Sequence, residues 1–355
     1  MSGRVLLYGA TGYSGSEIAQ RLVGHVDLVI AGRNADALQE LSTHLGVPWR
    51  SFEVADTAAA TAAVADADVL LNAAGPYADT AMPLAHACLH ARTHYLDIGG
   101  EWPVFAALME LDEVAEKAGV MLLPGVGLTI AASDCLLARA VELWPDTKAL
   151  HLGISRAHAM SRGSAKSAAR LFERGVIMRE DGQLQAVPLG AAPRSFDFGE
   201  GLRDTVAMSW ADVVTGEKTT GVANISVYSE LPWWQRAAYR ASGLYASLAG
   251  AGAMRKAGAR MADSWPRSPG EETRSEGEYV MVVEALDPWR RSRSLRLKTL
   301  DGYGTTVLTA SAAAEGVAMG QAEAGFRTPA AIFGSRFIET CGAGVFEPVT
   351  GVHAA

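Results

Sequence analysis

Cysteine is scarce in this sequence. Its 355 residues include three cysteines, Cys88, Cys135 and Cys341, and no two of them form a CxxC pair. This wide spacing favours neither a disulfide framework nor a cysteine zinc site, and it is typical of proteins in a reducing compartment. We therefore predict no metal site and a cytoplasmic location.

Long apolar segments and an excess of basic residues are also missing. No run of about 18 apolar residues occurs, and the residues before Val5 lack the charged region and apolar core of a signal peptide. There are 31 Lys and Arg against 39 Asp and Glu, a net charge of −8. Because nucleic-acid partners are normally met by clustered basic surface, we expect no nucleic acid and no membrane span.

What is present is an apolar chain with alternating strand and helix patterns. With 49% hydrophobic residues, it is long enough for two packed domains. Several predicted strands are apolar almost throughout, which is expected when helices cover both faces of a parallel sheet. The pattern predicts an α/β fold with a doubly wound, Rossmann-type parallel sheet. The predicted strands are Arg4–Tyr8, Val26–Ala31, Trp49–Val54, Asp68–Ala73, His94–Asp97 and Val120–Leu123.

The stretch VLLYGATGYSG, residues 5–15, places three glycines behind the first strand and at the start of a helix predicted from Tyr13 to Val23. In that position glycine lets the backbone approach a pyrophosphate, and the helix amino end favours an anion. The alternative is a turn whose glycines serve only packing. The turn residues predicted to bind the cofactor are Gly9, Ala10, Thr11, Gly12, Tyr13, Ser14 and Gly15.

The residues after the second strand indicate which dinucleotide binds. An NAD site usually has an acid here, whereas this chain has Arg33 and Asn34, and no acid occurs before Asp36. An arginine favours a 2′-phosphate, so we predict NADP(H), the alternative being a solvated loop arginine. Asp56, after the third strand, either reaches the adenine or caps the helix that begins near Thr57.

Two further loops are expected at the same edge of the sheet, where ligands of such folds bind. In NAAGPY, small residues leave room for ribose and pyrophosphate; the predicted contacts are Ala73, Ala74, Gly75 and Pro76, with Tyr77 next. In HYLDIGGEW, Asp97 and Glu101 follow the fifth strand. Either acid could take a chemical role, and Glu101 could instead simply begin a helix.

Two other chemistries are disfavoured. None of the nine tyrosines has a lysine four residues later, which argues against the Tyr and Lys pair of short-chain reductases. Cys135 lies within AASDCLLARAV, an apolar helical stretch, and is expected to be a buried thiol rather than a nucleophile.

Several of these motifs together resemble one family. YGATGYSG, AGRNADAL, NAAGPY, HYLDIGGE, PGVGLTIAASD and SRGSAKSAA are similar to the saccharopine dehydrogenase-like oxidoreductases, in particular to the branch that contains trans-acting enoyl reductases. The resemblance spans nearly the whole chain. It implies an NADP-binding Rossmann domain (1–130), an inserted α+β substrate and dimerisation domain on an antiparallel sheet (131–302), and C-terminal helices returning to the first domain (303–355).

Two basic segments have more than one interpretation. SRGSAKSAAR places Arg162, Lys166 and Arg170 on one helix face, which could grip a carboxylate or phosphate or could simply be solvated. The stretch 231–262 contains no acid and mixes aromatic residues with cations. It could contact a membrane surface through 232–262, dock an acidic carrier protein, line an apolar channel, or form an ordinary amphipathic lid. Its cations are Arg236, Arg240, Arg255, Lys256 and Arg260.

The predicted function is an NADPH-dependent reductase that delivers hydride to an apolar, small-molecule acyl substrate, free or carried by a protein, at a double bond or a related carbonyl. The protein would form a homodimer. The proton-donor candidates, in no order, are Tyr77, Ser133, Asp134 and Tyr303. The alternatives are reduction of an imine, as in the saccharopine-forming relatives, and a non-catalytic NADPH-binding scaffold.

Overall fold

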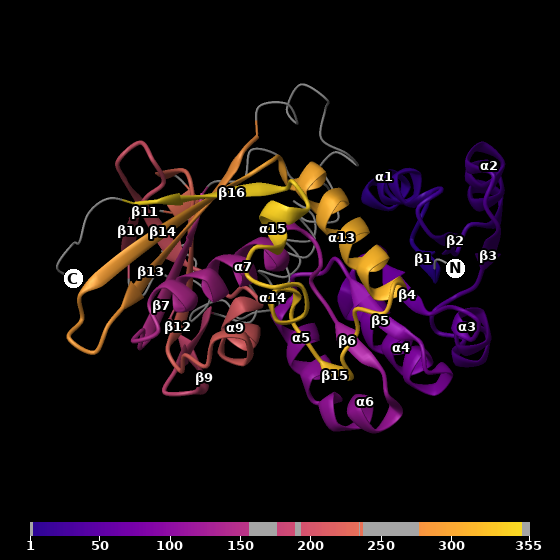
Figure 1. Cartoon of the computed structure of the whole chain (residues 1–355), viewed down its shortest axis with the longest axis horizontal. Helices are drawn as coiled ribbons and strands as arrows, with labels where there is room; N and C mark the ends of the chain where they lie inside the picture. Colours follow the sequence, from indigo (N-terminus) through magenta and orange to yellow (C-terminus); the bar gives the residue numbers. More distant parts are fainter. Residues whose placement is uncertain (1–2, 156–175, 189–192, 234, 237–276, 350–355) are drawn as a thin grey trace, which may run out of the picture. The chain divides into compact units, whose positions relative to one another are not determined.

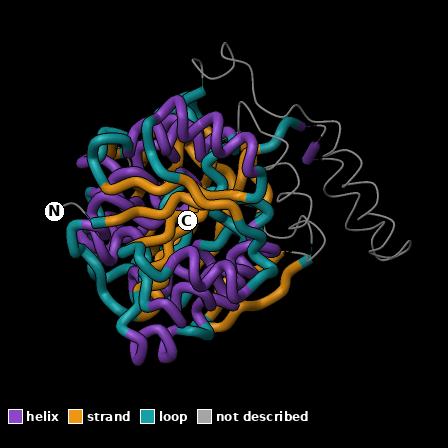
Figure 2. Tube along the Cα trace, turned by 90° about the vertical axis from the view of Figure 1, so that its right-hand side faces the viewer, coloured by secondary structure: helices purple, strands orange, loops and turns teal. Residues whose placement is uncertain are grey.

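The chain divides into two compact units in a computed structural model that describes residues 3–155, 176–188, 193–233, 235–236 and 277–349 (Figure 1). The first unit consists of Met1–Ala132 and Tyr303–Ala343, and the second of Ser133–Gly302 and Gly344–Ala355. Most of the described chain lies in helices and strands (Figure 2).

A seven-stranded parallel sheet forms the centre of the first unit. Its order is β15-β6-β5-β4-β1-β2-β3, so the order reverses between β1 and β4. The predicted Rossmann sheet is confirmed, with β15 as an additional strand beside β6. The strands are β1 (Arg4–Tyr8), β2 (Asp27–Gly32), β3 (Trp49–Ser51), β4 (Val69–Asn72), β5 (His94–Asp97), β6 (Met121–Leu123) and β15 (Gly325–Phe326).

Helices cover the strands of this sheet. All residues of β4 and β6 are buried, as expected for strands with helices on both faces. In Figure 1, α4 and α6 lie below β4 and β5, whereas α1 lies above β1 and α13 above β4. The helices are α1 (Tyr13–Leu22), α2 (Ala35–Leu45), α3 (Thr57–Val64), α4 (Tyr77–Ala91), α5 (Trp102–Met109), α6 (Asp112–Ala118), α7 (Leu128–Leu143), α13 (Gly302–Ala318), α14 (Pro329–Phe333) and α15 (Phe337–Thr340). The boundary between the units falls within α7, after Ala132.

The second unit contains a nine-stranded sheet. Its main path is β10-β11-β12-β7-β13-β14-β16, and β8 joins β12 to β9. We expected an antiparallel sheet, but β12 and β7 run parallel, so the sheet is mixed. The elements are β7 (Ala149–Ile154), β8 (Val176–Glu180), β9 (Gln183–Val187), β10 (Arg194–Asp197), β11 (Leu202–Ala207), α9 (Asp212–Thr220), β12 (Ile225–Glu230), β13 (Tyr279–Leu286), β14 (Ser292–Thr299) and β16 (Gly344–Pro348).

One part of the C-terminal prediction is wrong. We expected all of 303–355 to form helices that return to the first domain, yet Gly344–Pro348 forms β16 and pairs with β14 of the second unit. Ion pairs favour this pairing, because Glu347 lies 3.5 Å from Arg296 and 3.0 Å from Lys298, both on β14. The segment also contains Val345 and Phe346, which favour strands, and Gly344 and Pro348, which disfavour helices, so cross-strand pairing is the better outcome at the end of the described chain.

Candidate functional site

The glycine turn joins β1 to α1 with the geometry that a dinucleotide turn needs. Gly9 has φ +86°, and a Cβ there would lie 2.8 Å from the backbone of Ala73 and Ala74, so glycine permits both the turn and the approach of the next loop. A Cβ at Gly15 would lie 2.2 Å from the carbonyl oxygen of Gly9. Gly12 is exposed, and its amide donates to the Gly9 carbonyl over 2.9 Å.

The amino end of α1 differs from those of α2 and α3. Asn34 caps α2 by accepting from the Ala37 amide, and Asp56 caps α3 by accepting from the Ala59 amide. The capping interpretation of Asp56 is thus confirmed. The first residue before α1 is Gly12, which provides no capping side chain. The first amides of α1 are therefore suited to an external anion such as a pyrophosphate.

Arg33 follows β2 at the same edge of the sheet and is exposed. Its backbone carbonyl accepts from the Ser51 hydroxyl over 3.2 Å, which ties the start of this loop to the end of β3. Asp36 is the first acid after β2 and lies in the first turn of α2. The guanidinium of Arg33 is thus available to a 2′-phosphate without an acidic residue before Asp36 in the loop.

Glu101 brings the loops after β4 and β5 together. Its side chain is buried, with a relative exposure of 5%, and accepts from the backbone amides of Tyr77 and Ala78 over 3.3 Å each. Glu101 occupies the N-cap position of α5, in agreement with the helix-start interpretation, but its side chain forms no capping hydrogen bond with α5. Its carboxylate instead stabilises the amino end of α4, where the first helix amides donate hydrogen bonds and the helix dipole favours a negative charge.

Tyr77 lies between two carboxylates. Burial, followed by the negative charges of Asp97 and Glu101, raises its pKa well above the usual value. Proton loss would create a phenolate beside those carboxylates, which is unfavourable. Tyr77 is therefore a weak acid, and its phenol stays protonated over the physiological range.

Tyr303 approaches the glycine turn from the other end of the sequence. Its ring contacts that of Tyr13 edge to face, with 4.8 Å between the ring centroids. A second contact holds the same part of α13, because the hydroxyl of Thr306 accepts from the Leu128 amide over 3.1 Å. Sequence reasoning named both tyrosines but did not place them together, and it missed Thr306.

Ser133 and Asp134 lie in the second unit, on α7. Both side chains are fully buried, and Asp134 accepts a hydrogen bond from the hydroxyl of Thr219 on α9. Asp212, at the start of α9, was not singled out from the sequence. Burial raises the pKa of Asp212 to about 7; the Ser133 hydroxyl opposes this shift and the charge of Asp134 adds to it.

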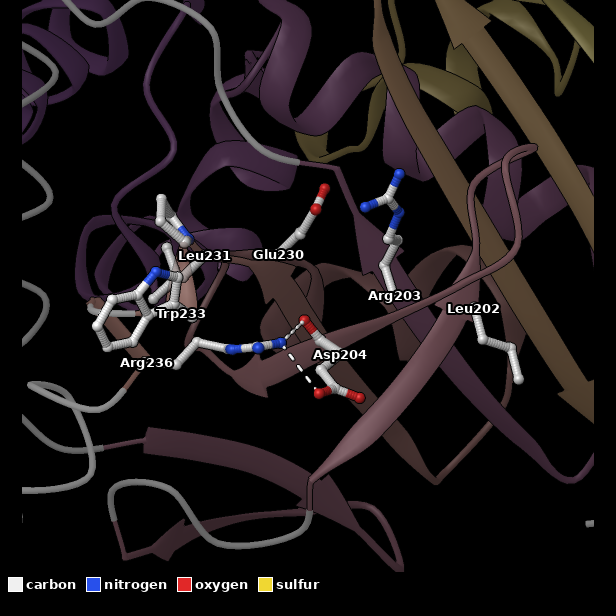
Figure 3. A pocket seen from close by; sticks show the side chains of 8 residues that line it. Leu202, Arg203, Asp204, Glu230, Leu231, Trp233 and Arg236 are labelled. Atoms are coloured by element: carbon white, nitrogen blue, oxygen red, sulfur yellow. Dashed lines mark hydrogen bonds and ion pairs between the residues drawn. The ribbon is translucent and has the colours of Figure 1, made fainter.

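The second unit also contains a surface pocket of about 390 Å³ (Figure 3). Arg236 crosses it and donates to the backbone carbonyl of Asp204 over 2.9 Å, with the Asp204 carboxylate 3.2 Å away. Trp233, 75% exposed, lies at its rim at the start of the acid-free stretch. The lining residues are Leu202, Arg203, Asp204, Glu230, Leu231, Pro232, Trp233 and Arg236.

Other predicted features have simpler outcomes. Cys135 is fully buried, as expected of a core thiol. Within the described ranges, no three His, Cys, Asp or Glu side chains are arranged to hold a metal ion. The helices seen there are also too short or too polar to cross a membrane. The predicted basic residues Arg162, Lys166, Arg170, Arg240, Arg255, Lys256 and Arg260 lie outside the described residues.

Together, the reversed strand order, the uncapped α1 and the converging loops define a dinucleotide-binding Rossmann domain. A family model described as the saccharopine dehydrogenase NADP-binding domain matches residues 5–123. Residues 5–123 of the first unit are thus similar to this NADP-binding domain, in agreement with the predicted resemblance and with NADP(H) as the cofactor.

Curated relatives point to the same family. A trans-acting enoyl reductase of Mycobacterium tuberculosis is 33% identical over 151 residues, which are 39% of this chain and 36% of the relative. That of Mycobacterium ulcerans is 32% identical over 105 residues, 27% of this chain and 25% of the relative. The matched segment thus spans about a third or less of the length of these curated relatives.

Solved structures extend the similarity of fold to nearly the whole chain. Apo saccharopine dehydrogenase (L-Glu forming) from Saccharomyces cerevisiae matches with a TM-score of 0.63 at 13% identity, over 98% of this chain and 100% of that one. Homospermidine synthase from Legionella pneumophila, solved in complex with NAD, matches with a TM-score of 0.65 at 9% identity, over 99% and 92%. At such identities the likeness shows the fold alone.

Proposed function

We propose that this protein is an NADPH-dependent reductase that transfers hydride to the double bond, or to a related carbonyl, of an apolar acyl substrate. The observation that carries the proposal is the glycine turn without a capping side chain, which lies within the residues 5–123 matched by the NADP-binding family model. Proteins named trans-acting enoyl reductases are similar to this chain over 151 residues. The proposed substrate class rests on the names of those relatives. The proposed nucleotide site rests on the geometry of this chain.

Bound NADPH would supply the hydride. The backbone of Gly9–Gly15 and the amino end of α1 would hold its pyrophosphate, and Arg33 with Asn34 would hold the 2′-phosphate. The small residues of the segment 73–76 would leave room for the ribose at the reversal of strand order. Asp56 would contribute through its cap on α3 rather than by touching the adenine.

Tyr303 is the best candidate for the proton donor among the four predicted. Its ring contacts the glycine turn through Tyr13, whereas a phenolate at Tyr77 would be disfavoured by Asp97 and Glu101. Ser133 and Asp134 are fully buried on α7. We expect Tyr303→Phe to lower kcat by about 10²–10⁴-fold, the usual range for loss of a general acid, with NADPH affinity unchanged.

The test of the function is NADPH oxidation by the purified protein with a panel of acceptors. The panel contains an enoyl thioester, an aldehyde, and an imine formed from a 2-oxo acid and a primary amine. We expect turnover with the enoyl thioester or the aldehyde. Turnover with the imine alone would favour the saccharopine-type alternative. NADPH binding without oxidation of any acceptor would identify a scaffold.

A carrier-bound substrate would need a docking surface, and the rim of the pocket in Figure 3 is where we infer it to begin. Trp233 is 75% exposed there, at the start of the acid-free stretch 231–262. Trp233→Ala should slow turnover of a carrier-bound enoyl substrate and spare the free thioester. Trp289→Ala is the matched control, because Trp289 is similarly exposed, at 71%, on the β13–β14 turn. Equal rates for Trp233→Ala on both substrate forms would reject docking.

Membrane contact through 232–262 and a homodimer stay predictions.

A further inference from the structure

Asp97 is a buried carboxylate at the end of β5, with no exposed surface. One oxygen, Oδ1, accepts from the backbone amides of Gly99 over 2.9 Å and Gly125 over 3.0 Å. The other, Oδ2, accepts from the Tyr95 hydroxyl over 2.8 Å. A single side chain thus joins the loop that follows β5 to the loop that follows β6.

The same network reaches the loop after β4. Asn72, at the end of β4, lies with its side-chain amide 3.4 Å from the Tyr95 hydroxyl and donates to the Thr80 hydroxyl over 3.1 Å. Its carbonyl oxygen accepts from the Ala74 amide over 3.0 Å, and Thr80 donates back to the Ala74 carbonyl over 2.7 Å. Three neighbouring strand ends are therefore connected through Asn72, Tyr95 and Asp97.

Packing of the core alone does not explain this network, because a buried carboxylate lowers stability. Burying a carboxylate disfavours its charged form, and apolar side chains of similar volume would pack the same space without that penalty. The amides that Asp97 accepts from belong to loops at the carboxyl edge of the sheet, not to the strand ladder. The hydrogen bonds thus fix the loops at the edge where a dinucleotide binds in this fold.

Among the residues that the structure describes, no cation affects the pKa of Asp97. The titratable groups facing it are Tyr95 of β5, Tyr77 of α4, and Glu101 of the loop before α5. From the loop after β6, the Gly125 amide donates to the Asp97 carboxylate, and the Val126 amide donates to the Asp97 backbone carbonyl over 2.8 Å. Gly99 adjoins the Tyr77 ring, because a Cβ there would lie 2.9 Å from it. The three amide and hydroxyl donors are therefore what favours the ionised form.

We propose that ionised Asp97 is the positioning residue for the nicotinamide half of the cofactor, because it holds the loops after β4, β5 and β6 in a single arrangement. The inference rests on the proposed function in so far as the nicotinamide lies at this edge. Asp97 itself need not touch the cofactor. The adenosine half, at the glycine turn and Arg33, should not depend on it.

A dependence on pH follows. Burial raises the pKa of Asp97 to about 6, against the opposing hydrogen bonds from Gly125, Tyr95 and Gly99. Protonation weakens those hydrogen bonds, since an ionised acceptor forms the stronger ones. Positioning of the nicotinamide should therefore be intact above pH 7 and should decline as the pH falls through about 6.

The experiment compares two probes across pH 5 to 8. NADPH carries both halves of the cofactor, and adenosine 2′,5′-bisphosphate lacks the nicotinamide. The quantity measured is the ratio of their affinities, with NADPH fluorescence read immediately after mixing at low pH. Wild type and Asp97→Asn are compared at each pH, because titration of the probes' own phosphates then cancels.

We expect Asp97→Asn to lower the ratio of NADPH affinity to adenosine bisphosphate affinity by about tenfold at pH 7.5, the effect of a lost charged hydrogen bond. As the pH falls through about 6, the ratio of wild type should decline toward that of the variant. Adenosine bisphosphate affinity should not change. Tyr95→Phe, which removes one donor and keeps the ring, should lower the ratio less and provides the test if the Asp97 variant does not fold. A ratio unchanged from wild type, whether both affinities fall equally or neither falls, would overturn the proposal. No acceptor is used, so a failure of the proposed reductase activity would be seen separately.

Discussion

We expect the choice between NADPH and NADH to depend on Arg33. It is exposed after β2, where no acid precedes Asp36. Arg33→Ala should weaken NADPH binding by roughly 1.5–3 kcal/mol, the range for a hydrogen bond to a charged group, and should leave NADH binding nearly unchanged. Isothermal titration with both nucleotides measures the difference.

The control for this prediction is Arg21→Ala. Arg21 is exposed in the last turn of α1, at the end remote from the glycine turn, and its loss removes the same charge from the same unit. It should affect neither nucleotide by more than a few tenths of a kcal/mol. Equal losses of NADPH and NADH affinity in the Arg33 variant would reject the assignment to the 2′-phosphate.

Asp212 should make the free energy of unfolding depend on pH. Its pKa is raised from 3.8 to about 7, chiefly by burial. Between pH 4 and 7 the folded protein retains a proton that the unfolded chain has released, so stability falls as the pH rises, by up to about 1.4 kcal/mol per pH unit. Asp212→Asn cannot ionise and should reduce this slope and stabilise the protein at pH 8.

Urea unfolding at pH 5, 6, 7 and 8 measures that slope. Asp181→Asn is the matched control, because Asp181 is exposed in the β8–β9 turn and its substitution should leave the slope unchanged. A parallel pH profile for wild type and Asp212→Asn would show that Asp212 is ionised in the folded protein at all these pH values.

The sequence pattern identified Arg33, and it singled out Asp97 only as an acid that follows the fifth strand, whereas it did not identify Asp212. Arg33 was predicted because its position after a strand has meaning in a one-dimensional pattern. Asp212 acquires its raised pKa chiefly from burial, and Asp97 acquires its properties from burial and from an amide distant in the chain, that of Gly125. A pattern of residue types does not contain those contacts.

At the scale of elements, we expect two glycines of the turn between β1 and α1 to have different roles, Gly15 in packing and Gly12 in nucleotide binding. Gly15→Ala should destabilise the fold, by roughly 1–3 kcal/mol as for an overpacked core, because its Cβ would meet the Gly9 carbonyl at 2.2 Å. Gly12 is exposed, and a Cβ there would meet the same oxygen at 3.1 Å. Gly12→Val should therefore abolish NADPH binding with little loss of stability, because its branches would fill the pyrophosphate's space.

Thermal unfolding and NADPH titration of both variants distinguish the two roles. Retained NADPH affinity in Gly12→Val would contradict a binding role and would show that these glycines serve packing alone. A large loss of stability in the same variant would contradict the view that Gly12 faces outward.

The elements themselves were largely predictable. The ends of the six strands predicted for the first unit agree with β1 to β6 to within three residues, because buried parallel strands are short apolar runs between clear breakers. The parallel pairing of β12 with β7, and the capture of β16 by β14, were not predictable. Both depend on which strand edges are available, and a local pattern does not record that.

At the scale of the whole molecule, the first unit is built from two distant segments of the chain. Tyr303–Ala343 supplies α13 and β15 to a unit otherwise made of Met1–Ala132. We expect α13, β15 and β6 to share one opening free energy in native-state hydrogen exchange, and saturating NADPH to protect all three by about 2.7 kcal/mol at 100 times Kd. Exchange of α13 independently of β6 would contradict a single cooperative unit.

The parallel pairing of β15 with β6 also has a consequence during translation. The amide of Gly325 bonds to the Val120 carbonyl, yet roughly 200 residues separate the two strands, so a ribosome adding 5–20 residues per second needs roughly 10–40 s to make the second after the first. Throughout that interval the nascent first domain has β6 as an open sheet edge, the kind of surface that recruits other strands. Slow decoding of the intervening codons should therefore lower the yield of native protein, and faster synthesis or a chaperone that covers strand edges should restore it.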